Sequence, residues 1–370
     1  MTMLPFTRPS LGEEEFKSVQ QVLESGWLTS GPRVTELEQE LSKFIGGGVT
    51  VRMFNSATSV LEAVLIANGI GPGDEVIVPA MSFVASANVV LRAGATPVFA
   101  EVELQSRNVN VESVKSAMSS KTRAVIPVHF SGMPVDMQPL YELATASNIL
   151  VLEDAAQAIG TSYKGEQIGS SGNPVAFSFH PNKNMTTIEG GAIACRDDGL
   201  IKLLESIRFH GIDRNESGEM MVEEWGGKMN MPDVCASVGL AQLQKLAAFN
   251  QKRRTLAQRY FDHLPRHPAM VLPADADGHS WHMFCICLDF EAIAKSREEV
   301  ISEFRQQNIM LGIHYPAIHL FGLYQRFGYG PGDFPVAERI GQQTLTLPLF
   351  PAMTNDDVDR VCGQFRNMLD

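Results

Sequence analysis

The stretch GDEVIVPAMSFVASANVVLRAGATPVF (73–99) contains two short apolar runs separated by a helical pattern. The first run, EVIVPA (75–80), is followed by a helical stretch that begins at Phe83, and the second run is TPVFAEV (96–102). Strands that are apolar on both faces and alternate with helices are typical of a parallel sheet covered on both sides. The stretch therefore predicts a strand–helix–strand unit.

The same alternation continues on both sides of this unit. VTVRMF (49–54) precedes it, and AVIPVHF (124–130) and ILVLED (149–154) follow it at similar spacing. VAFSFH (175–180) and GAIACR (191–196) are too close for a helical crossover, so we expect these two strands to pair directly, as in a hairpin. The sequence thus predicts an α/β fold with a mostly parallel sheet between helices.

The length of 370 residues favours two domains over one core. A helical pattern of about thirty residues begins at Pro232, and we place the domain change within it. Its apolar residues spaced for one buried stripe are Val234, Val238, Ala241, Leu243 and Leu246. The predicted division is a large domain of residues 1–240 and a small α+β domain of residues 241–370, with a strand at 280–290 and an amphipathic helix at 296–309.

The composition argues against several classes of protein. A net charge of −12 without a Lys/Arg cluster argues against nucleic acid as a partner, because phosphate contacts need a basic face. No apolar run has membrane-spanning length and no secretory signal is visible, so we expect a cytoplasmic protein that does not enter a membrane. The five cysteines are scattered and lack partners at zinc-site spacing, which predicts reduced core thiols and no metal site.

A lysine and an aspartate each follow an apolar run, in an order that suits one cofactor. Lys183 lies in FSFHPNKN (177–184), and Asp154 ends the run ILVLED upstream of it. Pyridoxal phosphate needs an amine for its aldehyde and a carboxylate that keeps its ring nitrogen protonated. Apolar flanks predict a buried Lys183 with a lowered pKa, although most lysines are solvated, and an aspartate after a strand is often only a helix N-cap.

Other residues can complete such a site. The segment 55–59 lies between a strand and a helix expected from Thr58, and free N–H groups at a helix start favour a phosphate. Ser178 can add a hydroxyl to the same phosphate, and Gln157 is placed to contact the phenolic oxygen of the ring.

Several ring side chains allow two interpretations. Phe83 either stacks on the pyridine ring or belongs to the core, and His180 is either a site residue or a hydrogen-bonded core residue. His314 and His319 lie on a proline-containing loop and are poorly spaced for a metal pair. A sugar or nucleotide contact and a purely structural role both remain open for these two histidines.

Together these motifs resemble the sugar-nucleotide aminotransferases of the DegT/StrS type, within the fold-type-I pyridoxal phosphate enzymes. The resemblance covers nearly the whole chain. The matching stretches are SGWLTSGP (25–32), NSATS (55–59), GDEVIVPAMSFVASANVVLRAGATPVF (73–99), EDAAQAIG (153–160), FSFHPNKNMTTIEGG (177–191), RFHGI (208–212), YQRFGYGPGDFPVAERI (324–340) and LPLFPAMTNDDVDRV (347–361).

The resemblance implies a seven-stranded, mainly parallel sheet in a large domain, a small C-terminal domain, and a homodimer with two shared active sites. It implies that Lys183 bonds the cofactor aldehyde, that Asp154 contacts the ring nitrogen and that Gln157 contacts the phenolic oxygen. The further cofactor contacts that it implies are Ala57, Thr58, Phe83, Ser178 and Asn230. The substrate contacts that it implies are Trp27, Thr29, His180, Lys228, His314, Tyr315 and His319.

One loop, GGKMNMPD (226–233), departs from the commonest pattern of the family. It is similar to the variant in enzymes that aminate C4 of UDP-linked 4-keto sugars, and the pair His180–Pro181 resembles the same branch. The matching loop of the family reaches the partner's phosphate, and either Lys228 or Asn230 can make that contact. The resemblance therefore implies transfer of the amino group of glutamate to C4 of a UDP-4-keto sugar, in the biosynthesis of cell-surface polysaccharide.

Three alternatives remain beside this interpretation. The acceptor can be a dTDP- or GDP-linked keto sugar, or a cyclitol ketone, in an enzyme of the same fold. A non-catalytic regulator that binds the cofactor is a different class, but a regulator has no use for the proton carrier Lys183. A dehydratase relative would have His in place of this lysine.

Overall fold

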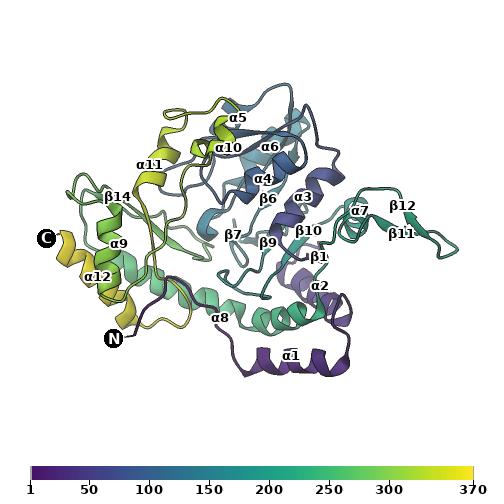
Figure 1. Cartoon of the computed structure of the whole chain (residues 1–370), viewed down its shortest axis with the longest axis horizontal. Helices are drawn as coiled ribbons and strands as arrows, with labels where there is room; N and C mark the ends of the chain where they lie inside the picture. The colour runs from purple at the N-terminus through teal and green to yellow at the C-terminus, as the bar shows by residue number, and fades with distance from the viewer. Residues whose placement is uncertain (1, 370) are drawn as a thin grey trace.

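Seven extended segments form the central sheet of the computed structural model, which describes residues 2–369 (Figure 1). Six of them are β1 (Thr50–Phe54), β2 (Glu75–Pro79), β3 (Thr96–Ala100), β4 (Thr122–Val125), β9 (Val175–Ser178) and β10 (Gly191–Cys195). The seventh comprises β5 (Leu150–Val151) and β6 (Glu153–Asp154), which pair with β4 and β9 respectively. The strand order across the sheet is therefore β3-β2-β4-β5/β6-β9-β10-β1.

All neighbouring strands in this sheet are parallel except where β10 takes part. β10 runs antiparallel to both β9 and β1, which confirms the direct pairing expected for the short connection between β9 and β10. β2 pairs in parallel with β3 and β4, as the sequence of the strand–helix–strand unit predicts. The predicted α/β fold with a mostly parallel sheet is confirmed.

Helices cover both faces of the sheet, which explains why most residues of its strands are apolar. On one face, α3 (Ala57–Ala67) packs against β9, α4 (Ala85–Arg92) and α7 (Asp198–Ile207). On the other, α2 (Pro32–Ile45) packs against β1 and α8 (Asp233–His263). Alternate residues of β10 belong to two hydrophobic clusters, one with Ile193 and Cys195 and one with Ala192 and Ala194.

Two of the helix boundaries differ from the sequence expectation. α3 begins at Ala57, one residue before Thr58, and Ser56 forms its N-cap by accepting the Ser59 N–H at 3.1 Å. α4 begins at Ala85, so Phe83 precedes the helix and lies in the turn after β2. Helix ends are the least determined part of a sequence pattern, because the cap and not the apolar spacing sets them.

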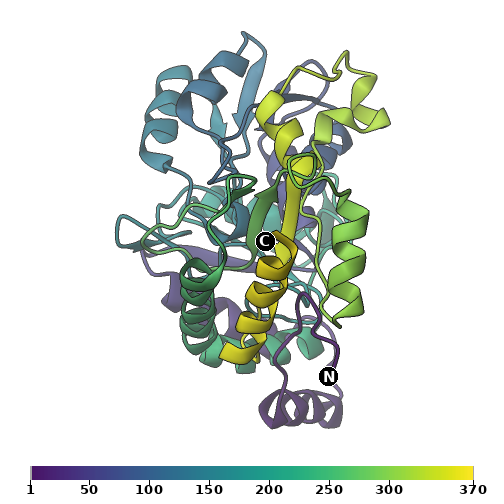
Figure 2. The ribbon, with the colours of Figure 1, turned by 90° about the vertical axis from the view of Figure 1, so that its left-hand side faces the viewer.

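The C-terminal part contains a second sheet. It is antiparallel, in the order β13 (Met270–Val271), β14 (Phe284–Leu288), β15 (Thr344–Leu347), and lies beside α9 (Arg297–Gln306) and α12 (Asn355–Leu369). In Figure 2, α12 lies between α8 and α9. The predicted strand at 280–290 and helix at 296–309 are present, and Ser296 and Glu299 form a capping box at the start of α9.

The long helix α8 connects the two parts of the chain. Its Leu246 belongs to the hydrophobic cluster under the large sheet, whereas Leu256 and Tyr260 belong to the cluster around β14. Of the predicted stripe, Val238, Ala241 and Leu246 are buried, while Val234 and Leu243 are half-buried. The division into residues 1–240 and 241–370 stays a prediction, and this change of cluster along α8 supports it.

Two segments cross this division. Leu4 belongs to the cluster around β14 and forms a parallel bridge with Ile309. In the opposite direction, residues of the C-terminal segment 317–340 belong to the hydrophobic cluster of the large sheet. This part of the chain forms η2 (Ile318–Leu320), α10 (Gly322–Gln325) and α11 (Pro335–Gln343). The remaining elements are α1 (Glu13–Ser25), α5 (Val111–Ala117), η1 (Phe130–Gly132), α6 (Met137–Ser147) and the hairpins β7 (Ser162–Tyr163)–β8 (Glu166–Gln167) and β11 (Ile212–Arg214)–β12 (Met220–Val222).

Within residues 2–369, none of the helices combines the length and the apolar character needed to cross a bilayer. Nor does this part of the chain bring three or more His, Cys, Asp or Glu side chains together in a way that could hold a metal ion. All five cysteines are free thiols, four of them buried and Cys235 half-buried.

Candidate active site

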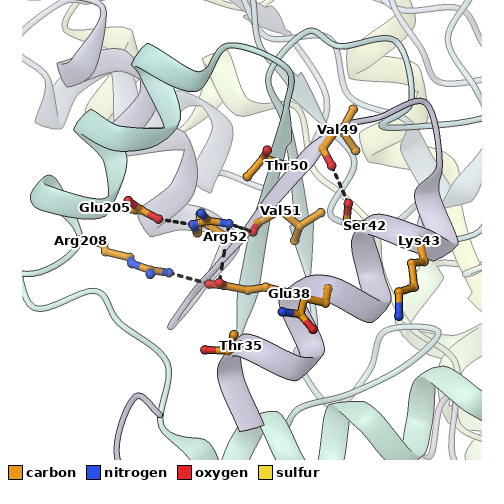
Figure 3. Close-up of a pocket in the computed structure, with 11 residues that line it drawn as sticks. Thr35, Glu38, Ser42, Lys43, Val49, Thr50, Val51, Arg52, Glu205 and Arg208 are labelled. Carbon is orange, nitrogen blue, oxygen red and sulfur yellow. Dashed lines mark hydrogen bonds and ion pairs between the residues drawn. The ribbon is translucent and has the colours of Figure 1, made fainter. Parts of the chain in front are cut away.

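A cavity of about 320 Å³ lies where β1, β6 and β9 end. This is the carboxyl edge of the parallel strands, where open α/β sheets bind their ligands. The predicted site residues that line it are Ala57, Thr58, Phe83, Asp154, Gln157, Ser178, His180, Lys183, His314 and Tyr315. A larger open groove of about 660 Å³ beside β1 contains none of the predicted site residues (Figure 3).

Lys183 enters the cavity from the turn after β9. Its backbone N–H donates to the His180 carbonyl at 2.9 Å, which closes the turn. Burial lowers the pKa of the Lys183 amine to about 8, and the negative charge of Asp154 acts in the opposite direction. A minor part of the amine is therefore already neutral near physiological pH and most of it is neutral above pH 8, and a neutral amine can act as a nucleophile.

Asp154 is buried at the end of β6, with 5% of its surface exposed. Ser86 donates its hydroxyl to Asp154 Oδ2 at 2.8 Å, and the Ala156 N–H donates to Oδ1 at 3.1 Å. The following residues form turns, so Asp154 is not a helix N-cap and that alternative is wrong. Two donors hold the carboxylate in one orientation within the cavity.

Gln157 is held by a backbone donor from another element. Its Oε1 accepts the Ser131 N–H at 2.6 Å, and only 4% of Gln157 is exposed. Because the oxygen is engaged in this bond, the amide nitrogen is the group that remains to donate toward a ligand in the cavity.

The start of α3 forms one wall of the cavity, next to β10. Ser56 and Gly191 approach each other so closely that a Cβ on Gly191 would lie 2.3 Å from the Ser56 carbonyl carbon and from the Ala57 nitrogen. The helix N-terminus therefore sits directly on β10, with its first N–H groups and the nearby Ser178 at the cavity. Such a helix start favours a bound phosphate.

Phe83 and Tyr315 form an aromatic side of the cavity. Their ring centroids are 5.7 Å apart, and Phe83 is 54% exposed, so the alternative that Phe83 is a core residue is wrong. A hydrogen bond of 2.8 Å joins His314 Nδ1 and Thr346 Oγ1. Burial, together with the positive charges of Lys183 and Arg107, lowers the pKa of His314 to about 4, so His314 is neutral at physiological pH.

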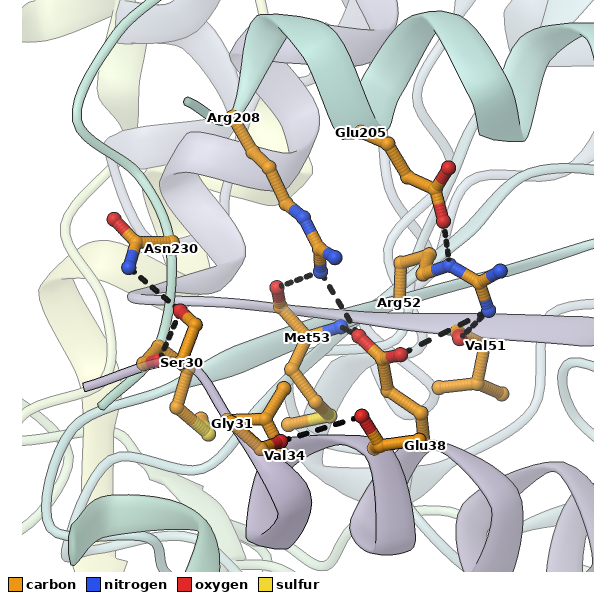
Figure 4. Close-up of polar contacts among 12 residues, drawn as sticks. Ser30, Gly31, Val34, Glu38, Val51, Arg52, Met53, Glu205, Arg208 and Asn230 are labelled. Atoms are coloured by element: carbon orange, nitrogen blue, oxygen red, sulfur yellow. Dashed lines mark hydrogen bonds and ion pairs between the residues drawn. The ribbon is translucent and has the colours of Figure 1, made fainter. Parts of the chain in front are cut away.

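Four predicted residues form a separate group at the surface, outside the lining of this cavity. They are Trp27, Thr29, Lys228 and Asn230. The Lys228 ammonium donates to Asn230 Oδ1 at 2.6 Å, as expected for side chains two positions apart in an extended segment. Asn230 in turn donates to Ser30 Oγ at 2.7 Å, which joins the loops 26–31 and 226–233 (Figure 4).

The environment of His319 disagrees with the predicted substrate contact. His319 is fully buried, contacts Glu338 Oε1 at 3.0 Å and packs against the rings of Phe99 and Phe334. It lies among the residues that join the segment 317–340 to the large sheet, and does not line the cavity. His319 is therefore a packing residue.

Several residues of the site have no recognisable signal in the sequence. Ser86 and Ser131 orient Asp154 and Gln157, and no sequence pattern distinguishes them from other serines in helices and turns. Asn182 lines the cavity and also a narrow adjoining cleft that contains His282. His282 is 4% exposed, and neither of its ring nitrogens has a hydrogen-bond partner among residues 2–369.

These groups fit pyridoxal phosphate. The cavity contains a partly neutral amine, a fixed carboxylate, an amide donor, an aromatic face and a helix N-terminus placed against a glycine. An aldehyde, a pyridine nitrogen, a phenolic oxygen, a flat ring and a phosphate are the matching groups of this cofactor. The amine and the carboxylate are the pair that the chemistry requires.

Comparison with known proteins supports this fit. The model of the DegT/DnrJ/EryC1/StrS aminotransferase family matches residues 9–366. The spore coat polysaccharide biosynthesis protein SpsC of Bacillus subtilis is 38% identical, over 99% of this chain and 97% of that protein.

Two solved structures extend the comparison to the fold. PseC of Helicobacter pylori, an aminotransferase involved in the biosynthesis of pseudoaminic acid, has a TM-score of 0.92 and 27% identity, over 100% of this chain and 99% of that one. Spr1654 of Streptococcus pneumoniae, in its PLP form, has a TM-score of 0.90 and 30% identity, over 99% of this chain and 98% of that one. The chain belongs to the DegT/DnrJ/EryC1/StrS aminotransferase family and is a pyridoxal-phosphate-dependent enzyme.

Proposed function

We propose that this aminotransferase transfers the amino group of glutamate to C4 of a UDP-linked 4-keto sugar. The observation that carries the proposal is the cavity in which Lys183, Asp154 and Gln157 converge at the start of α3. Relatives named for the biosynthesis of a spore coat polysaccharide and of pseudoaminic acid support a sugar acceptor and a role in polysaccharide biosynthesis. The sequences FSFHPNKN and GGKMNMPD support the C4 position and the UDP group.

Each residue of the cavity has a defined task in this proposal. Pyridoxal phosphate, when bound, supplies an aldehyde that carries the amino group and a ring that accepts electrons. Lys183 would hold the cofactor through its aldehyde at rest, and its freed amine would then carry the proton in both half-reactions. Asp154 keeps the ring nitrogen protonated, and Gln157 donates to the phenolic oxygen.

The remaining contacts concern phosphate, ring and substrate. Ala57, Thr58 and Ser178 would hold the phosphate, with Phe83 over the ring. His180, His314 and Tyr315 line the same cavity and would face the sugar. A neutral His314 can accept a hydrogen bond from a sugar hydroxyl, which a protonated ring cannot do.

We also propose a homodimer in which each active site is shared. The group Trp27, Thr29, Lys228 and Asn230 lies at the surface, and exposed large apolar side chains adjoin it: Trp225 nearby in the sequence, and Phe209, which pairs with Lys228. A second copy of the chain would cover these side chains and receive the loop 226–233, and a two-fold axis makes the exchange mutual. The free cysteines support a cytoplasmic location.

A substrate screen tests the proposed reaction. The enzyme is incubated with glutamate and with UDP-, dTDP- and GDP-linked 4-keto and 3-keto sugars, and the release of 2-oxoglutarate is followed. We expect the fastest turnover with a UDP-4-keto sugar and none with Lys183→Ala. Turnover with a dTDP-3-keto sugar and with no 4-keto sugar would contradict the proposal.

A further inference from the structure

β1 is the edge strand of the central sheet, and side chains bond to the backbone at its end. Glu38, on α2, accepts the Met53 N–H at 2.8 Å through Oε1. Arg208, directly after α7, donates from Nη1 to the Met53 carbonyl at 2.8 Å and to the same Glu38 oxygen at 2.9 Å (Figure 4). Both backbone polar groups of Met53 are therefore bonded to one ion pair.

The chain beyond Arg208 pairs with the loop that precedes α8. The Arg208 carbonyl accepts the Met229 N–H at 2.8 Å, and Phe209 forms an antiparallel bridge with Lys228. On the other side of the loop, the Asn55 N–H donates to the Met229 carbonyl at 2.7 Å. The loop thus lies between Arg208 and the residue that follows β1.

We propose that the Glu38–Arg208 pair positions two cofactor-binding elements at once: the start of α3 and the loop Lys228–Asn230. Between Met53 and Ala57 the chain has only three residues, so a shift at Met53 moves the phosphate-binding helix start. A shift of Arg208 moves Met229 and the loop with it. This inference rests on the proposed function, which assigns the phosphate to the start of α3 and the loop to the partner's site.

The environment of the pair suits such a task. Glu38 is 9% exposed, and Arg52 lies 3.8 Å from its second oxygen, so the carboxylate is nearly enclosed by donors and positive charge. Hydrogen bonds to a charged group are shorter and stronger than bonds between neutral groups, so a neutral side chain of the same shape would hold Met53 and Arg208 more weakly. Glu205 belongs to the same cluster, but its carboxylate bonds to Arg52 and forms no hydrogen bond or ion pair with Met53 or Arg208 among residues 2–369, which makes it a matched control (Figure 3).

Three single variants and one double variant test the proposal. Glu38→Gln removes the charge and keeps the shape, Arg208→Lys keeps the charge and loses the forked donor, and Glu205→Gln is the control. Each dimer is stripped of cofactor and titrated with pyridoxal phosphate, and binding is followed by the visible absorption band. Hydrogen exchange of the peptide 226–231 is measured by mass spectrometry on the same samples, at a temperature where each protein is folded.

We expect Glu38→Gln and Arg208→Lys each to raise the dissociation constant of pyridoxal phosphate about tenfold, and the double variant to add little, because both remove one interaction. The peptide 226–231, which contains the Met229 amide, should exchange its hydrogens faster in both variants. Glu205→Gln should have the wild-type affinity and exchange rate. A merely structural role would lower the melting temperature and leave affinity and exchange of the folded protein unchanged, and that result overturns the proposal. If Glu38→Gln does not fold, the cofactor affinity and hydrogen exchange of Arg208→Lys decide by themselves whether the pair has a positioning role.

Failure of the proposed reaction can be told apart from failure of this inference. If the wild type binds the cofactor but aminates no nucleotide sugar, the proposed substrate is wrong and the affinity measurements still decide the positioning role. If the affinity and the exchange of Glu38→Gln and Arg208→Lys equal those of Glu205→Gln, the positioning role is wrong whatever the substrate.

Discussion

At the scale of single residues, the environment of Lys183 sets its reactivity. Burial lowers the pKa of the amine from 10.5 to about 8, so the neutral form becomes the major form above that pH. When pyridoxal phosphate is added to the protein without cofactor, the visible band should appear about tenfold faster per pH unit below 8 and level off above it. Stopped-flow absorption from pH 6 to 10 measures this rate, with Lys183→Ala as the blank.

The same shift makes the stability of the cofactor-free protein depend on pH. Between about 8 and 10.5 the unfolded chain keeps a proton on Lys183 that the folded chain has lost, so the free energy of unfolding rises with pH in this window. Lys183→Met should lack this contribution. In the stopped-flow experiment, a rate of band formation that keeps rising up to pH 10 would show that the amine behaves like an exposed lysine. The proposed effect of its burial on the pKa would then be wrong.

At the scale of secondary structure elements, the contact between β10 and α3 sets the position of the helix start that we propose as the phosphate site. The Gly191→Ala variant places a methyl group 2.3 Å from backbone atoms of Ser56 and Ala57, so β10 or the helix start must move. We expect a loss of about 1–3 kcal/mol of stability and a weaker affinity for pyridoxal phosphate. Thermal unfolding and cofactor titration measure the two effects.

The control for this variant is Gly322→Ala, at the start of α10. A Cβ there meets no atom within 4 Å, so the substitution should leave affinity and melting temperature close to the wild type. If Gly191→Ala binds the cofactor as tightly as Gly322→Ala, the close contact between β10 and the start of α3 is not needed for the phosphate site.

At the scale of the whole molecule, the cavity around Lys183 and the surface group that contains Lys228 and Asn230 should meet at the interface of the proposed homodimer. We expect Lys183→Ala to be inactive, and the double variant Lys228→Ala/Asn230→Ala to be inactive as well. After the subunits exchange, each mixed dimer contains one subunit of each variant. One of its two active sites should then combine an intact Lys183 with an intact loop from the other subunit, and activity should return. If mass spectrometry shows mixed dimers and no activity appears, the loop acts within its own subunit.

The pattern of the sequence alone was enough to predict the sheet and the convergence of the proposed cofactor residues in one cavity. Runs such as EVIVPA and GAIACR are apolar on both faces because helices cover both sides, and this periodicity is a local property that can be read along the chain. Lys183, Asp154 and the segment 55–59 follow strands, and parallel strands end at one edge of a sheet, so their convergence was also predictable.

The tertiary structure alone decided what supports these residues and which of them belong to the cavity. Ser86 and Ser131 bond to Asp154 and Gln157 across long sequence distances, and no spacing rule identifies such partners. His314 and His319 are close in the sequence, yet His319, in η2, packs among Phe99 and Phe334 while His314 lines the cavity. The reason is that the segment 317–340 returns to the hydrophobic cluster of the large sheet. Long-range packing depends on the shapes of surfaces that fold together from distant parts of the chain, and a pattern of neighbouring residues does not contain that information.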